Sequence, residues 1–427
     1  MNRKRLIIIF VSAGAAALLA VAGIFIFGLK GFRRFTVPPR VAVSYPDRGG
    51  AAPQFMGILV PGIKKETSLY IFEEILPAES YTRLLPEKLQ DPLAGDLFYT
   101  PDNNLLHYVT ALNLSASWDS QERKTIEKVL PEAMCNLSND SEGNSCYLPV
   151  TWYPWGIYYR KSVFTQLGLS VPESWEDFLN TCKVLKENDY DPIAMISQVR
   201  WPLLVWFDYL DIRINGPEFH KAFINLEIPF NDERVRNVFE VILELIEQDY
   251  MAVDYQSPDW EGQYNAVKNG KAVMVLSGNF FYDRSDEQLK QDLGWFSFPV
   301  VDNRTVKSEI IASSGFIISR TAPKRENIGI LYEYVLSENF QDRIFDGTGL
   351  FPVNEASILK LERDDAVNGY LQIENAEILF AMTERIGHPQ MLIPFKEGLS
   401  RLVAVHFKSD IDRILQDLEN IRQDILQ

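Results

Sequence analysis

Histidine, cysteine and serine motifs are the patterns from which most catalytic and metal sites are built. The chain has four histidines, and no two of them are spaced as in HExxH, nor any two cysteines as in CxxC: His107, His220, His388 and His406. It also lacks a GxSxG elbow, a Walker A loop and a GxGxxG fingerprint. We therefore expect no metal, no cofactor and no enzyme activity. Because a glycosidase carboxylate pair is defined by separation in space, the 58 acidic residues leave a cleft enzyme, such as a glycosidase or lyase, as an alternative.

Aromatic residues carry more information than these motifs do. They gather in the stretches WYPWGIYY, RWPLLVWFDYL and SGNFFYD, which contain Trp152, Tyr153, Trp155, Trp201, Trp206 and Phe280. A flat ring packs on the C–H face of a sugar while neighbouring polar groups bind the hydroxyls. Core packing is the alternative for each ring, since aromatic side chains are the largest core residues. Because each stretch interrupts strand-like sequence with Pro or Gly, we favour loops that line a cleft.

Charge and length limit the partners of this chain. Its 427 residues suffice for two lobes, and 46% apolar with 23% charged residues is typical of a folded protein. Seven of the 42 basic residues precede position 41 with no acid among them, so the remainder has 35 basic against 58 acidic residues, a formal charge of −23. Such a body is repelled by nucleic acid and by anionic lipid.

The N-terminus has the pattern of a membrane segment. Residues 6–29 contain no charge and follow Arg3, Lys4 and Arg5, which matches the roughly 20 residues of a transmembrane helix and the start of a secretory signal. A cleavage site at residues 20–22 is the alternative, but the apolar run continues beyond it, so we predict an uncleaved anchor. The soluble part then lies in the periplasm or otherwise outside the cytoplasm.

The cysteines fit an oxidising compartment without requiring one. Cys135 and Cys146 bracket a polar loop, and either a disulfide bridge or two thiols is consistent with that spacing. Cys182 lies on the apolar side of an expected helix and belongs to the core.

Short apolar runs alternate with amphipathic helices along the rest of the chain. We expect strands at 57–60, 69–72, 272–276, 294–301 and 315–320. Helices are expected after Ser174, after Asn231 or Asp232, and after Ser409, with Asp177 and Asp412 completing the first and last caps. The fold class is therefore mixed α/β with central sheets.

Several of these segments together resemble a known family. Leu148-Pro149, the run Tyr158 to Lys161, and Gly168-Leu169 through Pro172 to the Ser174-Trp175-Glu176-Asp177 turn are similar to the signature region of the maltose-binding type of bacterial extracellular solute-binding proteins. GKAVMVLSGNFF, FSFPVV, SSGFIISR and GTGLFPVNEAS follow in the order of that family, over roughly residues 85–427. Phe280 stands where the family often has a sugar-stacking tryptophan.

The resemblance implies a two-lobe, type II periplasmic-binding-protein-like fold with an interlobe cleft, preceded here by the predicted transmembrane helix. It implies residues 1–39 as anchor and tether, 40–150 with 305–347 as lobe 1, and 151–304 with 348–427 as lobe 2. The candidate ligand contacts are the residues Trp152, Tyr153, Trp155, Trp201, Trp206, Phe280 and Ser314, with Asp96, Arg200 and Glu309 as polar candidates. The implied function is capture of a small solute, a sugar or oligosaccharide, for an ABC permease. A sensory or scaffolding ectodomain that acts with a membrane partner is the alternative.

Overall fold

A long strand, β4 (Tyr147–Arg160), takes part in both halves of the sheet around which this protein is built. The computed structural model describes residues 38–48, 52–91, 93–101, 109, 114–138, 145–196, 201–254, 261–322, 325–383, 387–402 and 408–427. Residues Arg40–Gln427 form one compact unit. The other strands are β1 (Arg40–Pro46), β2 (Tyr70–Leu76), β3 (Leu97–Thr100), β5 (Asp191–Ile196), β6 (Met251–Asp254), β7 (Ala272–Gly278), β8 (Leu293–Phe296), β9 (Ser308–Ile318), β10 (Phe351–Pro352) and β11 (Ile378–Phe380).

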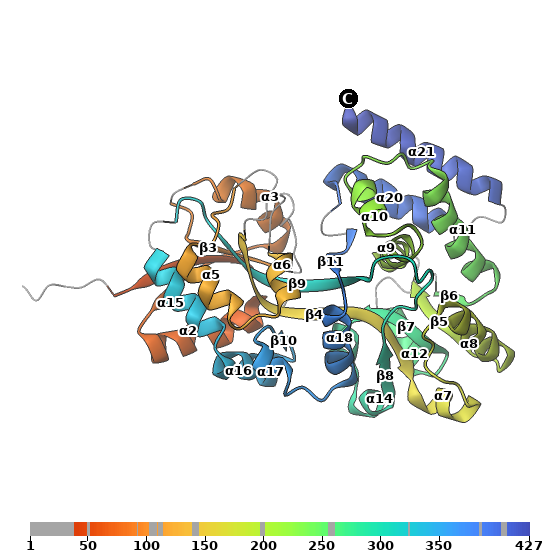
Figure 1. Ribbon diagram of the computed structural model, residues 1–427, viewed down its shortest axis with the longest axis horizontal. Helices are drawn as coiled ribbons and strands as arrows, with labels where there is room; N and C mark the ends of the chain where they lie inside the picture. The colour runs from red at the N-terminus through yellow and green to blue at the C-terminus, as the bar shows by residue number, and fades with distance from the viewer. Residues whose placement is uncertain are drawn as a thin grey trace, which may run out of the picture. The chain divides into compact units, whose positions relative to one another are not determined.

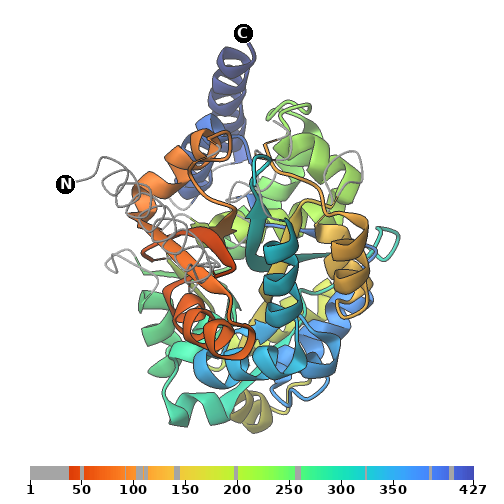
Figure 2. The ribbon, with the colours of Figure 1, turned by 90° about the vertical axis from the view of Figure 1, so that its left-hand side faces the viewer.

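The helices form two groups. The first group contains the helices that precede β4 in sequence and the first four that follow β9: α2 (Ala52–Thr67), α3 (Ala78–Lys88), α5 (Ser120–Glu127), α6 (Glu132–Leu137), α15 (Arg325–Val335), α16 (Glu338–Thr348), α17 (Glu355–Ile358) and α18 (Asp364–Glu374). The others are α7 (Lys161–Leu167), α8 (Trp175–Glu187), α9 (Trp201–Asn215), α10 (Pro217–Ile224), α11 (Glu233–Glu247), α12 (Glu261–Lys268), α13 (Phe280–Arg284), α14 (Glu287–Asp292), α20 (Pro389–Arg401) and α21 (Lys408–Leu426). In Figure 2, α2, α15 and α16 lie together on the near side of the first group.

The strand order explains why β4 and β9 hold the two groups together. Neighbouring strands run β2-β1-β3-β9-β4-β7-β5-β6, with β10 and β8 also pairing with β4 and β11 with β9. The first half of β4 pairs antiparallel with β9 from Tyr147 to Pro154, whereas the second half pairs with β7 from Trp155 onward and with β8 from Ile157 onward. Figure 1 shows β4 and β9 running from one group of elements into the other.

The hydrophobic core divides at the same place. One cluster combines β1, α2, the start of β4, α15 and α16, and it also contains Phe351, Val353, Ala366 and Tyr370 from the later return of the chain. A second cluster combines the end of β4, β7, α8 to α11, α20 and α21. Among the described residues, these two large clusters are joined through β4 and β9.

Several predicted elements are confirmed. Ser174 and Asp177 form a capping box at the start of α8, and the side chain of Asp232 caps α11. Phe178 of α8 and Val238 and Phe239 of α11 are buried, as expected of amphipathic helices that pack on a core. The predicted strands at 272–276 and 315–320 are β7 and the end of β9.

Two local predictions are wrong. Residues 57–60 are not a strand but part of α2, in which Phe55, Met56, Leu59 and Ile63 are buried. Their spacing of three and four residues is helical, but Gly57 and Pro61 hide it, since both residue types usually mark turns. Ser409 lies inside α21 rather than at its cap, because the helix already begins at Lys408.

The predicted membrane anchor at 6–29 lies outside the described residues. Within the part of the chain that the structure describes, no helix has both the length and the apolar composition needed to span a bilayer.

Candidate functional site

Four aromatic rings from three separate stretches of sequence meet at one place. The ring centroid of Trp155 lies 5.8 Å from that of Trp201 and 5.8 Å from that of Phe280. Tyr153 joins them, with its ring 6.2 Å from Trp155 and 6.1 Å from Phe280. We call Tyr153, Trp155, Trp201 and Phe280 the aromatic cluster. It unites four of the seven ligand contacts predicted from sequence.

The sheet explains why these residues converge. Tyr153 and Trp155 are two positions apart on β4, so their side chains point to the same face. Trp155 pairs with Gly278 at the end of β7, and Phe280 follows two residues later at the start of α13. Trp201 begins α9 shortly after β5, which runs parallel to β7. Because parallel strands end at the same edge of a sheet, the three segments meet there, as at ligand sites of other open α/β sheets.

Glycine at position 278 is required for this packing. A Cβ atom at Gly278 would lie 2.5 Å from Cε2 of Tyr153 and 2.9 Å from Cε1 of Phe280. Real side chains do not approach so closely, so any larger residue would displace both rings.

The members of the aromatic cluster differ in exposure. Trp155 is 1% exposed, whereas Tyr153, Trp201 and Phe280 are half-buried. Trp155 therefore packs behind the other three rings, on the side away from solvent. The three half-buried rings present apolar surface that a ligand can cover.

Three other predicted contacts lie elsewhere. Trp152 is buried in the first core, where its indole N–H donates to the carbonyl of Pro352 at 2.7 Å. Trp206 is buried in the second core, where its ring lies 5.3 Å from that of Phe298. Ser314 is buried on β9 opposite Thr151.

Asp96 and the two cysteines Cys135 and Cys146 form hydrogen bonds with backbone groups. Asp96 accepts a hydrogen bond from the backbone N–H of Ala42, and Arg200 lies outside the described residues. The structure records Cys135 and Cys146 as thiols rather than as the disulfide that the sequence left open, and each donates to a backbone carbonyl nearby.

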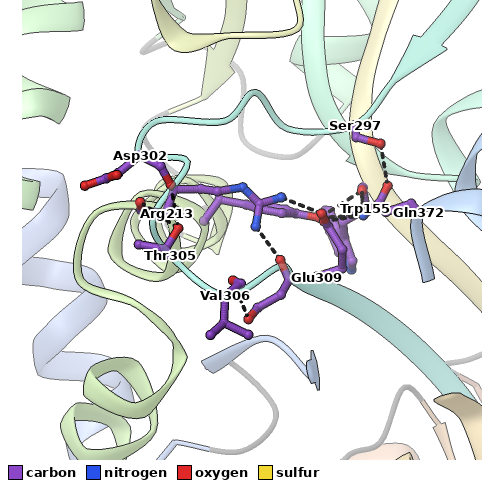
Figure 3. A network of polar contacts seen from close by, with 10 residues as sticks. Trp155, Arg213, Ser297, Asp302, Thr305, Val306, Glu309 and Gln372 are labelled. Carbon is purple, nitrogen blue, oxygen red and sulfur yellow. Dashed lines mark hydrogen bonds and ion pairs between the residues drawn. The ribbon is translucent and has the colours of Figure 1, made fainter. Parts of the chain in front are cut away.

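Glu309 belongs to a buried polar network at the point where β9 enters the second core (Figure 3). Its carboxylate accepts from the guanidinium of Arg213 at 2.6 Å and from the amide of Gln372 at 2.5 Å. The hydroxyl of Tyr209 and the amide of Gln372 also donate to the carbonyl of Trp155. Burial raises the pKa of Glu309, although the charge of Arg213 opposes that shift. The network thus fixes β4 directly beneath the aromatic cluster.

A second charged group, which sequence reasoning missed, holds α13 in place. The guanidinium of Arg363, at the start of α18, donates to Asp283 of α13 at 2.7 Å and to Asp365 at 2.7 Å. Asp365 also accepts from the hydroxyl of Tyr158 at 2.7 Å. Burial raises the pKa of Asp283 to about 6 despite the charge of Arg363. No local pattern could reveal this contact, because Asp283 and Arg363 are 80 residues apart in the chain.

Comparisons with known proteins bear on the family and the fold of this chain. The family model of the bacterial extracellular solute-binding proteins matches residues 96–341. An ABC transporter extracellular-binding protein of Pyrococcus horikoshii is 29% identical over 126 residues, which are 29% of this chain and 28% of that protein. The multiple sugar-binding protein of Streptococcus mutans is 29% identical over 161 residues, 36% of this chain and 38% of that protein. The chain thus aligns with well under half the length of these relatives.

Solved structures resemble the chain over nearly its whole length. The bacterial solute receptor AcbH, which has an exclusive preference for β-D-galactopyranose, has a TM-score of 0.83 at 20% identity and covers 91% of this chain and 98% of its own. A chitin oligosaccharide binding protein has a TM-score of 0.70 at 18% identity and covers 90% and 100%. At these identities the likeness concerns the two-lobe fold.

Proposed function

The chain belongs to the family of bacterial extracellular solute-binding proteins, and on that basis we propose that it captures a sugar or oligosaccharide outside the cytoplasm and delivers it to an ABC permease. The family accounts for the extracytoplasmic location. The sugar class is supported by the relatives, one of which is a multiple sugar-binding protein, and by solved neighbours that bind galactopyranose and chitin oligosaccharide.

The aromatic cluster is the observation that carries this proposal. Its three half-buried rings form an apolar surface at the carboxyl edge of β5 and β7, next to the strand that joins the two cores. Sugars are bound by such rings because their C–H faces are apolar while their hydroxyls need polar partners nearby. Tyr153, Trp201 and Phe280 are the proposed contacts, and Trp155 is the residue that positions them.

We assign the remaining candidates to packing. Trp152 and Trp206 are each only 1% exposed, and a buried ring cannot reach a ligand without unpacking its core. We assign Ser314 to the β4–β9 pairing as well, since it is buried there opposite Thr151.

We propose that capture works by closure of the two lobes. The core that contains β1 defines lobe 1 and the core that contains α9 defines lobe 2, with residues 351–373 supported as part of lobe 1 by their packing. Contacts to both lobes exist only in the closed state, so a ligand shifts the population toward that state by its difference in affinity. The permease then recognises the closed form. The predicted anchor at 6–29 would keep the protein beside that permease and raise its local concentration.

A thermal-shift screen with one matched control tests this function. The protein is heated with mono- and oligosaccharides, polyols and amino acids, and a ligand at a hundred times its Kd should stabilise it by about 2.7 kcal/mol. Trp201→Ala should abolish the shift. Trp175→Ala, which removes a half-buried tryptophan on α8 outside the aromatic cluster, should keep it. A sugar shift that survives Trp201→Ala would contradict the assignment, and amino acids alone shifting the midpoint would contradict the sugar class.

A further inference from the structure

A pocket of about 750 Å³ lies on α18 and the segment of residues 297–307 that joins β8 to β9. Residues before α8 close one side, and Arg213 and Glu309 are at its base. This volume is typical of small-molecule sites. No member of the aromatic cluster lines the pocket, so it is separate from the proposed sugar site.

Exposed apolar side chains gather around this pocket. Val171, Val300, Val306 and Leu371 all line it, and they are 42%, 46%, 40% and 52% exposed. Single exposed hydrophobic residues are ordinary on a protein surface, whereas a group of them around one cavity is typical of a binding site. They come from three different segments of the chain, so the fold, and not a local run of sequence, brings them together.

The floor of the pocket is polar but nearly neutral (Figure 3). The side chains of Arg213 and Glu309 neutralise each other, and Gln372 accepts from Ser297 at 3.1 Å while it donates to Glu309. Asn368 of α18 and Asn375, which follows that helix directly, add amide groups at the wall. Amides and hydroxyls offer donors and acceptors together, which is what an uncharged hydroxyl-bearing ligand needs.

The other charges around the pocket are mostly negative. Glu173, Asp302 and Asp364 line the pocket, and Lys307 is the basic residue that lines it besides Arg213. Asp302 and Asp364 are paired with Arg304 and Lys161, so the charges around the pocket are largely balanced, which suits an uncharged ligand better than an ion.

We propose that this pocket is a second small-molecule site, which binds an uncharged, hydroxyl-bearing compound with an apolar ring or chain. The hydroxyls face the amides of α18 and Gln372, and the apolar part covers the valines and Leu371 at the rim. No residue of the aromatic cluster lines this site, so the proposal can be tested separately from the proposed sugar transport.

The test uses p-nitrophenyl β-D-glucopyranoside, an uncharged glycoside with an aromatic ring, titrated calorimetrically into the full-length protein. Trp201→Ala removes the proposed sugar site, and Asn368→Trp fills the pocket from an exposed helical position. Val367→Trp adds the same ring to the neighbouring exposed position, which does not line the pocket.

Binding that persists in Trp201→Ala and weakens at least tenfold when Asn368→Trp is added, but not when Val367→Trp is added, supports the second site. Absence of binding in Trp201→Ala would overturn it. Equal binding with and without Asn368→Trp would overturn it too, and would leave the apolar rim to a macromolecular partner. Failure of the proposed sugar site would appear differently, as wild-type sugar binding in the double variant Trp201→Ala with Asn368→Trp, in which the pocket is filled as well.

Discussion

The ion pair between Arg213 and Glu309 provides the sharpest test of the packing beneath the aromatic cluster. The two side chains are 6% and 11% exposed, and Arg213 also donates to the carbonyl of Ser308. Arg213→Met keeps much of the side-chain volume but leaves the carboxylate of Glu309 without its charged partner. Removing one member of a buried pair costs about 3–5 kcal/mol of unfolding free energy, so we expect a loss near the lower end for a pair at the edge of a pocket.

The pH dependence of this loss follows from the pKa of Glu309. Burial already raises that pKa in the folded protein, and loss of the Arg213 charge raises it further. An acid with a raised folded pKa contributes stability below its unfolded pKa and loses that contribution as pH rises through the folded value. The cost of Arg213→Met should therefore be smaller at pH 5 than at pH 7.5, because the neutral form of Glu309 becomes more populated as the pH falls.

Equilibrium urea unfolding at both pH values measures these differences, provided that fluorescence and circular dichroism give coincident transitions. The double variant Arg213→Met with Glu309→Gln should recover at least half of the loss, because no uncompensated charge remains. Arg304→Met serves as the control, since Arg304 pairs with Asp302 on the surface and should give no measurable change. An equal loss at pH 5 and 7.5, or no recovery in the double variant, would refute the reasoning.

Three further predictions follow from individual contacts. Gly278→Ala should weaken sugar binding at least tenfold by displacing the ring of Tyr153, whereas Gly329→Ala, where an added Cβ meets nothing within 4 Å, should leave calorimetric binding unchanged. Trp152→Phe should cost about 1–3 kcal/mol in urea unfolding, because it leaves a buried carbonyl without its donor, and should leave sugar affinity intact; a large loss of affinity would contradict its assignment to the core. Burial raises the pKa of Asp208 from 3.8 to about 6, so its ionisation lowers stability by up to about 3 kcal/mol between pH 4 and 7; Asp208→Asn should remove that share of the pH dependence, and an unchanged profile would show that the shift is absent.

Sequence periodicity and caps were sufficient for elements whose signals are local. The capping box at Ser174 and the cap of α11 at Asp232 appear in the structure as predicted. The helix α2 was missed because Gly57 and Pro61 interrupt its pattern, although its buried residues have helical spacing.

Which aromatic residues belong to the site could not be predicted from local sequence. Sequence alone treated Trp152 and Trp155 alike, but they lie three positions apart on one strand and therefore on opposite faces. The face of each depends on how β4 passes from one core to the other, which is a tertiary property. The Arg363 contacts and the pocket on α18 likewise need segments that only the fold brings together.

The central claim is that the three half-buried rings of the aromatic cluster bind a sugar. Calorimetric titration of Phe280→Leu with the sugar found by the screen tests it most directly, because leucine keeps an apolar side chain but removes the flat ring. Phe345→Leu, a half-buried phenylalanine of the other core, is the matched control. We expect an affinity lower by about tenfold for Phe280→Leu, equivalent to about 1.4 kcal/mol of lost ring contact, and no change for Phe345→Leu. Wild-type affinity in Phe280→Leu would contradict it.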